Sequence, residues 1–253
     1  MTVLDRFRLD GKIALVTGAA TGLGAAMALA LAEAGATVAC HGNRRPAEET
    51  AKAILAAGGH AAAFSADLSE RAGAEKLFAD ASSLGPIDIL INNAGVIHRS
   101  AAEDFALEDW ERVLQVNLTS MFQLCQLAGK GMLERGGGKI VNVASLLSFQ
   151  GGVRVPAYAA SKGGVAQLTK ALANEWAGRR VNVNAIAPGY FRTTNTSTLQ
   201  ADETRNRQIL ERIPAQRWGD PGDLAGAAVF LSSPASDYVH GEVLVVDGGW
   251  MAR

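Results

Sequence analysis

The chain has 253 residues, of which 48% are apolar, and a formal net charge of −1 at pH 7. This length and composition suit one α/β domain with a large core, and the mixed charges, without a basic block, argue against nucleic-acid binding. No run approaches roughly 18 continuous apolar residues and no apolar stretch follows the N-terminus, so we expect a cytoplasmic protein without membrane contact.

Short apolar runs alternate with helical stretches along the whole chain. The expected strands are residues 13–16, 37–41, 61–65, 87–91, 139–144, 181–187 and 242–246. The expected helices are residues 23–34, 46–57, 72–83, 104–135, 156–178 and 221–232. Strands that alternate with helices predict right-handed βαβ units, and hence a doubly wound parallel β-sheet with helices on both faces. No linker or repeat divides the chain, so residues 1–253 are expected to form a single domain.

Three glycines follow the first expected strand at the spacing G-x3-G-x-G: Gly18, Gly22 and Gly24. Gly18 permits a tight turn, Gly22 lets a phosphate approach the backbone, and Gly24 lets the next helix pack closely. The N-terminus of that helix offers free N–H groups and the positive end of a dipole, which together bind a pyrophosphate. The turn therefore predicts a dinucleotide site, although a glycine-rich turn at this place can also be purely structural.

The end of the second expected strand bears on which dinucleotide binds. Sites that prefer NAD place an Asp or Glu there, about 20 residues past the glycines, to hold the ribose 2′-hydroxyl. This chain has Gly42 and Asn43 instead, followed by Arg44 and Arg45. The two guanidiniums favour the 2′-phosphate of NADP; the alternative is that they are solvated residues that cap the next helix.

Other strand ends also carry polar residues or glycines. Asp67 follows the third strand and is a candidate adenine contact, Asn93 follows the fourth, Ser145 the fifth and Pro188 the sixth. Ligands of a doubly wound sheet bind outside the carboxyl ends of its strands, so these residues are expected to converge with Gly18 on one crevice. The irregular insertion at about 188–215 is expected to be a substrate lid.

Ser145, Tyr158 and Lys162 form the pattern S-x12-Y-x3-K. Residues four apart share a helix face, so the ammonium of Lys162 is expected beside the phenol of Tyr158. A neighbouring cation lowers a tyrosine pKa, and lowering it by about three units takes roughly 4 kcal/mol. Tyr158 is then a general acid/base, Ser145 bonds the reacting substrate oxygen, and Asn117 lies in a kinked helix that holds a water relaying protons from Lys162. Taken singly, each residue also fits a structural role: a surface pair, a cap, or a buried hydrogen bond.

Together these residues resemble the motifs of the short-chain dehydrogenase/reductase family over nearly the whole chain. The motifs are T-G-x3-G-x-G from Thr17, N-N-A-G from Asn92, Asn117, Ser145, Y-x3-K from Tyr158 and P-G-x3-T from Pro188. The resemblance implies a Rossmann-type fold, NAD(P)-dependent oxidation or reduction of a CH–OH group, and a homotetramer. It also implies a catalytic tetrad of Asn117, Ser145, Tyr158 and Lys162.

The same resemblance implies which residues of this dinucleotide-binding domain hold the cofactor. Lys162 would also contact the nicotinamide ribose, and Thr193 the carboxamide. The expected cofactor residues are Gly18, Thr21, Gly22, Leu23, Asn43, Arg44, Asp67, Leu68, Asn93, Ala94, Gly95, Tyr158, Lys162, Pro188, Gly189, Phe191 and Thr193. No metal is expected, because Cys40 and Cys125 stand apart and the four histidines are scattered.

Residues 145–158, 184–190, 212–219 and 247–253 are similar to a narrower group in the family, the 2-dehydro-3-deoxy-D-gluconate 5-dehydrogenases, also called 2-deoxy-D-gluconate 3-dehydrogenases. This similarity implies a small deoxy keto sugar acid as substrate. It suggests NAD(H), whereas Arg44, Arg45 and the missing acid favour NADP(H). Two alternatives remain: a 3-oxoacyl-thioester reductase of the same fold, which needs an apolar acyl groove, and a non-catalytic dinucleotide-sensing protein. The tetrad argues against the second, because binding alone requires neither Tyr158 nor Ser145.

A sugar acid needs a cation to orient its carboxylate. Arg154, four residues before Tyr158, and Arg99, beyond the fourth strand, are candidates because a guanidinium binds a carboxylate in a bidentate fork. Gln150, in the loop of Arg154, completes the expected substrate site with Ser145 and Tyr158. We expect Arg99 and Arg154 on opposite lips of the crevice; the alternative is that each caps or forms a salt bridge locally.

Overall fold

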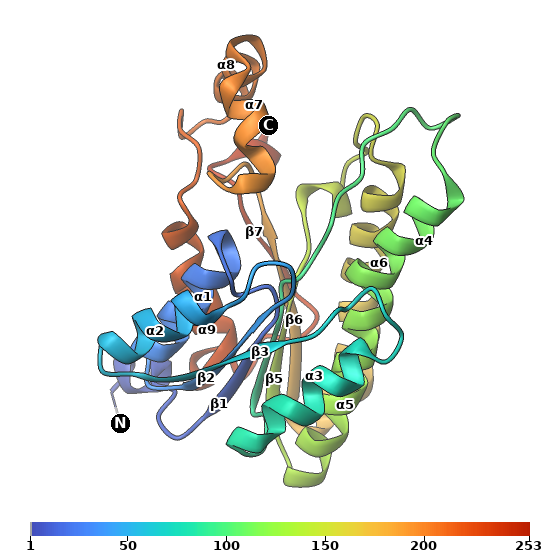
Figure 1. Cartoon of the computed structure of the whole chain (residues 1–253). Helices are drawn as coiled ribbons and strands as arrows, with labels where there is room; N and C mark the ends of the chain where they lie inside the picture. The colour runs from blue at the N-terminus through green and yellow to red at the C-terminus, as the bar shows by residue number, and fades with distance from the viewer. Residues whose placement is uncertain (1) are drawn as a thin grey trace.

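Seven parallel strands form one sheet in this computed structural model, which describes residues 2–253 apart from the side chain of Asn195. The strands are β1 (Ile13–Val16), β2 (Thr37–Gly42), β3 (His60–Ser65), β4 (Ile89–Asn92), β5 (Gly138–Val143), β6 (Val181–Pro188) and β7 (Val243–Val246). Their order is β3-β2-β1-β4-β5-β6-β7 (Figure 1). Strands β2 and β3 are added on one side of β1 and strands β4 to β7 on the other, so the order of the strands reverses between β1 and β4. The predicted doubly wound parallel sheet is confirmed.

Helices cover both faces of this sheet (Figure 1). Helices α1, α2 and α9 pack on one face, and α3, α5 and α6 on the other. The helices are α1 (Gly22–Glu33), α2 (Glu48–Ala56), α3 (Gly73–Ala81), α4 (Leu107–Leu114), α5 (Ser120–Arg135), α6 (Pro156–Trp176), α7 (Ser197–Ala201), α8 (Glu203–Arg212) and α9 (Ala225–Ser232). Within residues 2–253, no helix is both long enough and apolar enough to span a bilayer.

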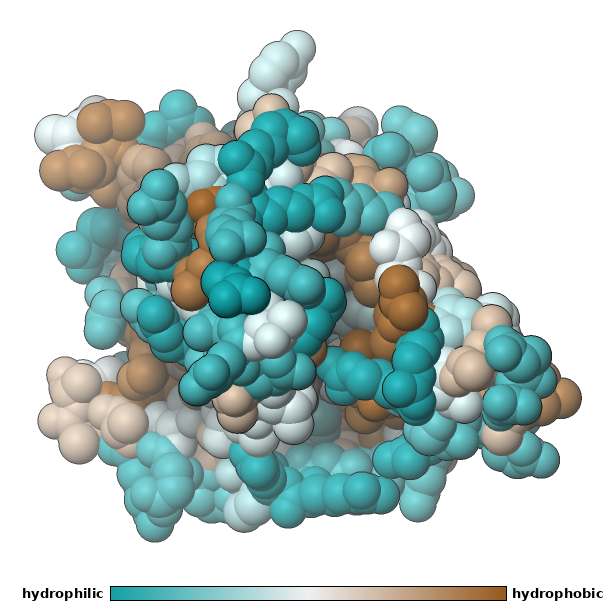
Figure 2. All heavy atoms as spheres, turned by 90° about the horizontal axis from the view of Figure 1, so that it is seen from above, coloured by the Kyte–Doolittle hydropathy of each residue, from teal (hydrophilic) through white to brown (hydrophobic). Residues whose placement is uncertain are grey.

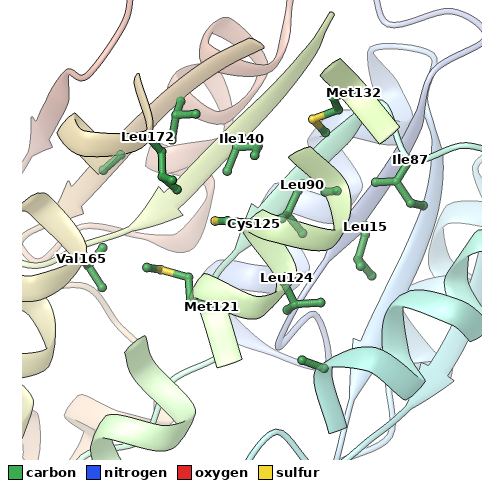
Figure 3. Packing of buried hydrophobic residues seen from close by; sticks show 14 of the residues in the cluster. Leu15, Ile87, Leu90, Met121, Leu124, Cys125, Met132, Ile140, Val165 and Leu172 are labelled. Atoms are coloured by element: carbon green, nitrogen blue, oxygen red, sulfur yellow. The ribbon is translucent and has the colours of Figure 1, made fainter. Parts of the chain in front are cut away.

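Side chains of the central strands alternate between the two faces. Leu15 of β1 packs in one core cluster with Met121 and Leu124 of α5 (Figure 3). Its neighbours Ala14 and Val16 pack in a second cluster, on the side of α1, α2 and α9. This is the period of two that strand geometry dictates. Both faces are buried, which explains why the strands read as continuous apolar runs in the sequence.

The helix expected over residues 104–135 is interrupted. It forms α4 and α5, joined by a π-helical turn at Gln115–Thr119. Such turns occur often at functional sites because they displace side chains from the regular helical array. Asn117 lies within this turn, so the kink expected at this residue takes the form of a π turn.

The carboxyl ends of the strands point to the side of the molecule where α7 and α8 stand above the sheet (Figure 1). Both helices belong to the insertion after β6, which also contains a 3-10 turn at Thr194–Thr196. Seen from this side, the surface is mainly hydrophilic, with apolar side chains in the recesses between polar ones (Figure 2). The C-terminus lies near the insertion and the N-terminus at the other end of the sheet (Figure 1).

Candidate active site

The glycine turn between β1 and α1 has the backbone that the sequence predicts. Gly18 and Gly22 have positive φ angles, 66° and 58°, a region that favours glycine. A Cβ atom on Gly24 would collide with the carbonyl oxygen of Gly18 and the side-chain amide of Asn93. The hydroxyl of Thr21, the residue before α1, makes no capping hydrogen bond to the helix. The helix therefore starts directly against the turn, with an amino end suited to a phosphate group.

Thr17 and Asn93 join the glycine turn to the loop after β4. The Thr17 hydroxyl accepts hydrogen bonds from the backbone amides of Asn93 and Ala94, both at 2.9 Å. The side-chain amide of Asn93 donates to the carbonyls of Thr17 and Gly18, at 2.9 and 3.1 Å. Asn93 thus holds two walls of the crevice together. Thr17 is not among the predicted site residues; its place directly before the first glycine was the available signal.

The loops after β2 and β3 meet at Asp67. Its carboxylate accepts hydrogen bonds from the amide and hydroxyl of Ser69, at 2.8 and 2.6 Å. These bonds, together with the Asn43 side chain and the charge of Arg44, hold the pKa of Asp67 below its ordinary value. The structure thus brings Asn43, Arg44 and Asp67 together. Leu68 is 4% exposed in the core, so only its backbone is available to a ligand.

The insertion after β6 borders the glycine turn through Thr193. A Cβ atom on Gly22 would lie 3.5 Å from the Thr193 methyl carbon. Thr193 begins the 3-10 turn with a capping box, and Gly189 donates its amide to the Val246 carbonyl at 2.9 Å. Phe191 is 4% exposed and its ring lies against Gly219, so its side chain belongs to the core.

Arg45 reaches the same insertion from the loop after β2. Its guanidinium donates to the Thr194 hydroxyl at 3.3 Å. Arg44 and Arg45 are both exposed, and the N-cap of α2 is Ala47. The two arginines are therefore solvated, as one alternative held, but they do not serve as the N-cap of the next helix.

Tyr158 and Lys162 lie one turn apart on α6, as predicted. The Lys162 ammonium is 5.7 Å from the centroid of the Tyr158 ring and donates to the Val143 carbonyl at 2.5 Å. Lys162 is 4% exposed, and burial lowers its pKa to about 8. Ser145, two residues past Val143, accepts a hydrogen bond from the Leu147 amide at 3.1 Å. The expected acid/base residues therefore lie together at the carboxyl end of β5.

Burial raises the pKa of Tyr158, while hydrogen bonding with Ser145 and the charge of Arg99 lower it to a smaller extent. The net lowering expected for this pKa is not found in the structure, because burial of the phenol outweighs the effects that lower it. Two cations lie near the phenol: Arg99, whose charge lowers the pKa, and Lys162, 5.7 Å from the ring centroid. Ser145 and Arg99 thus offset part of the cost that burial imposes on the phenolate.

Asn117 ties the loop after β4 to α6. Its Oδ1 accepts from the Val96 amide at 2.8 Å, and its Nδ2 donates to the Val96 carbonyl at 2.9 Å and to the Ser161 hydroxyl at 3.1 Å. Both N–H groups of the side chain are thereby used. A relay water at Asn117 has to bind its backbone or the remaining lone pair of Oδ1.

Arg99 and Arg154 lie on loops that touch. The Ser100 amide donates to the Arg154 carbonyl at 3.0 Å, so the two arginines share one wall of the crevice instead of opposite lips. Both are exposed, and Arg154 has a positive φ of 63°. Within residues 2–253, no carboxylate forms an ion pair with either guanidinium. Both remain available to an acidic ligand.

Gln150 binds the C-terminal turn. Its Nε2 donates to the Met251 sulfur at 2.8 Å, and its Oε1 accepts from the indole of Trp250 at 3.4 Å. Trp250 is in turn covered by Arg212, whose guanidinium lies 4.1 Å from the ring centroid, and by Tyr190, at 4.6 Å between centroids. The C-terminus therefore supports the loop that carries Arg154, and Gln150 is a link in that support.

Comparisons with known proteins agree with this geometry. A family model described as "Enoyl-(Acyl carrier protein) reductase" matches residues 18–251. The chain is 54% identical to the 2-dehydro-3-deoxy-D-gluconate 5-dehydrogenase of Bacillus subtilis, over 98% of each chain. It is 51% identical to the Escherichia coli enzyme of the same name, over 99% of this chain and 100% of that one. A structure from Agrobacterium tumefaciens, provisionally assigned as a 2-deoxy-D-gluconate 3-dehydrogenase and holding NADP, superposes with a TM-score of 0.93 at 55% identity, over 98% of this chain and 99% of that one.

Proposed function

The chain belongs to the short-chain dehydrogenase/reductase family, and from that membership we propose that it acts as a 2-dehydro-3-deoxy-D-gluconate 5-dehydrogenase. It is an NAD(P)-dependent oxidoreductase. The proposed reaction transfers a hydride reversibly between the nicotinamide cofactor and a secondary alcohol or ketone of the deoxy keto sugar acid. Full-length relatives at 49–54% identity carry this activity in their names, which supports the same substrate class here.

One observation carries the substrate proposal most directly. The charge of Arg99 lowers the pKa of the Tyr158 phenol, and within residues 2–253 this guanidinium forms no ion pair. A carboxylate bound there places the rest of a small sugar acid beside the phenol and Ser145. The hydrogen-bonded loop of Arg154 adds a second guanidinium on the same wall. A neutral acyl chain has no carboxylate to pair with these guanidiniums.

The proposed chemistry divides among three side chains. In the direction of alcohol oxidation, the Tyr158 phenolate takes the hydroxyl proton, and in reduction the phenol returns a proton to the carbonyl oxygen. Ser145 donates its hydroxyl proton to the same substrate oxygen and so holds it in line with Tyr158. Lys162 is protonated below its pKa of about 8 and, next to the phenol, supplies a proton route to it. When bound, the nicotinamide ring accepts or donates the hydride at the alcohol carbon.

The residues present fit a dinucleotide. At Gly18, Gly22 and Gly24 the turn where the pyrophosphate would lie presents backbone without a side chain. Asn93 fixes that turn, and Asp67 borders the adenosine end beside Asn43 and Arg44. We propose that NADPH is accepted at least as well as NADH, because two arginines and no acid follow β2. The NADP held by the Agrobacterium relative supports this choice.

We also propose that residues 188–215 act as a substrate lid within the single domain. The base of this insertion is closed: the Arg192 amide donates to the Gly219 carbonyl at 2.8 Å, and the Gly219 amide to the Tyr190 carbonyl at 2.9 Å. The Arg192 guanidinium bonds to Asp220 at 2.9 Å. Above this base, α7 and α8 overhang the strand ends (Figure 1), so their movement changes access to the crevice without unfolding the sheet.

Absorbance at 340 nm tests the proposed function. The protein is mixed with 2-dehydro-3-deoxy-D-gluconate and NAD⁺ or NADP⁺, and in parallel with an acetoacetyl thioester and NADPH. We expect turnover of the sugar acid and little of the thioester. Turnover of the thioester alone supports the 3-oxoacyl-thioester reductase, and cofactor binding without turnover of either supports the non-catalytic sensor.

A further inference from the structure

His41 is a buried histidine that the proposed chemistry does not use. It is the fifth residue of β2 and is 2% exposed. Strand β2 lies between β3 and β1, and β1 ends opposite Cys40. His41 is therefore placed one residue past the end of β1, level with the glycine turn. Its neighbour across the other edge of the strand is Phe64 of β3.

The imidazole bridges two loops. Its Nδ1 lies 3.2 Å from the backbone nitrogen of Gly18, and its Nε2 lies 3.1 Å from the carbonyl oxygen of Ala66. Because an amide can only donate and a carbonyl can only accept, Nδ1 is the acceptor and Nε2 carries the proton. One neutral tautomer satisfies both partners. Burial, which lowers the pKa of His41, favours the same neutral form.

The backbone of His41 also holds the turn. Its carbonyl accepts a hydrogen bond from the Ala19 amide at 2.7 Å. The successive amides of Gly18 and Ala19 therefore both donate to His41. Ala66 directly precedes Asp67, which lies at the proposed adenosine end of the crevice. A single side chain thus joins the proposed pyrophosphate turn and the proposed adenosine loop, which would bind adjacent parts of one dinucleotide.

We infer that His41 is a positioning residue of the cofactor site, and that its neutral imidazole sets the spacing between the glycine turn at Gly18 and the loop at Ala66–Asp67. This inference rests on the proposed function to the extent that the cofactor occupies this crevice. Without the imidazole, the Gly18 amide loses its acceptor, and the turn keeps only its bonds to the His41 carbonyl and to Asn93. A preformed site binds more tightly than one that has to be ordered on binding.

Three substitutions separate the two side-chain contacts. His41→Asn keeps an acceptor at the place of Nδ1, His41→Gln keeps a donor at the place of Nε2, and His41→Ala keeps neither. Ser236→Ala is the matched control: Ser236 is also fully buried and bonds two carbonyls, those of Leu231 and Ser233, but it lies near the amino ends of the strands. The control therefore removes buried hydrogen bonds of the same kind away from the crevice.

The readouts are the Kd of NADPH and NADH, from the fluorescence of the reduced nicotinamide without substrate, and kcat and KM for the cofactor. We expect His41→Ala to raise Kd and KM about ten-fold or more with kcat changed less than about three-fold. His41→Asn and His41→Gln should each recover part of that loss, and Ser236→Ala should bind like the wild type. The inference is overturned if all three His41 variants bind as the control does, or if kcat falls at unchanged KM. Wild-type protein that binds neither cofactor would instead contradict the proposed function.

If His41→Ala does not fold, the Asn and Gln variants, which keep a polar group of similar size, carry the test. A Kd above that of the wild type for either variant supports the inference, and values equal to that of the wild type for both overturn it.

Discussion

A backbone hydrogen bond of 3.0 Å joins Ser100 to Arg154 and fastens the loop after β4 to the loop that enters α6. The bond places Arg99 and Arg154 on the same wall of the crevice. Arg99 there acts on the pKa of Tyr158, the proposed acid/base. In the proposed function, the two touching loops therefore carry both the guanidiniums for the substrate carboxylate and a charge that acts on the phenol.

Arg154→Ala should raise KM for the sugar acid ten-fold or more, equivalent to about 1.4 kcal/mol, because a guanidinium that can bind the carboxylate in a bidentate fork is lost. Steady-state kinetics on the acid and on its uncharged primary amide measure the effect. The amide should be turned over about as well by the variant as by the wild type. Arg154→Lys is the control, since it keeps the charge without the fork. Equal losses for acid and amide would show that Arg154 is structural.

Arg99→Ala should have a similar effect on KM and one more on pH dependence. Because the Arg99 charge lowers the pKa of Tyr158, its removal should move the rising limb of the pH profile of alcohol oxidation to higher pH. The measurement is kcat/KM between pH 6 and 10. If the rising limb stays at the same pH, Arg99 does not affect the pKa of Tyr158.

Tyr158→Phe should lower kcat by about 10²- to 10⁴-fold with a nearly unchanged Kd for the cofactor, because only the ionisable oxygen is lost. Lys162→Ala should lower kcat and also raise the Kd for the cofactor, since Lys162 is expected to hold the nicotinamide ribose as well. Turnover at 340 nm and a fluorescence titration of NADPH separate the two quantities. Substantial kcat remaining in Tyr158→Phe would mean that another group is the acid/base.

Replacing both Arg44 and Arg45 by alanine should weaken NADPH binding selectively, because a charge-assisted hydrogen bond to the 2′-phosphate contributes about 1.5–3 kcal/mol. The Kd values of NADPH and NADH, measured side by side, give the ratio. Arg45 also bonds to Thr194 of the insertion, so Thr194→Val serves as the control for losing that contact alone. A uniform loss for both cofactors, or no loss, contradicts a phosphate clamp.

The buried ammonium of Lys162 should make the folded state more stable as the pH rises. Burial lowers its pKa from 10.5 to about 8, so between these values the unfolded chain holds a proton that the folded chain has lost. Stability therefore rises with pH through this window. From pH 7.5 to 9.5 the free energy of unfolding of the wild type should increase by about 2 kcal/mol relative to that of Lys162→Met.

Urea unfolding of both proteins at the two pH values measures this difference. Cys40 and Cys125, whose pKa burial raises to about 12, act in the opposite direction above pH 9, and the comparison between variants cancels them. A constant difference between the two proteins would show that Lys162 keeps its ordinary pKa.

We expect a homotetramer in solution. The apolar side chains of Leu107 on α4 and Phe122 on α5 are 65% and 37% exposed, on helices that cover an outer face of the molecule (Figure 1). Covering such side chains stabilises an assembly. Light scattering at micromolar concentration should give four times the 26.4 kDa monomer mass, and the monomer mass itself would rule out the assembly.

Local patterns in the sequence were sufficient to predict the parallel sheet. The runs around Leu15 and Leu90 are apolar because both faces of a parallel strand are covered. The turn after β1 could be predicted because a backbone at positive φ, as at Gly18, favours glycine. The crevice also followed from the sequence, because topology brings the carboxyl ends of all parallel strands to one edge. The spacing of Tyr158 and Lys162 predicted one helix face for the same kind of reason.

Contacts between distant segments were decided by the tertiary structure alone. No sequence spacing shows that Gln150 bonds to Met251, that Asn93 holds the glycine turn, or that His41 joins Gly18 to Ala66. These contacts depend on which side chains meet after the sheet is assembled.

The sign of a pKa shift is the clearest case. The sequence determined that a lysine lies one turn from Tyr158, and from this alone a lowered tyrosine pKa follows. The fold decided that the Lys162 ammonium bonds to the Val143 carbonyl, that the phenol is buried, and that Arg99 approaches it from another loop. A pKa depends on the solvent and charges around a group in three dimensions, and helical spacing fixes only one of those neighbours.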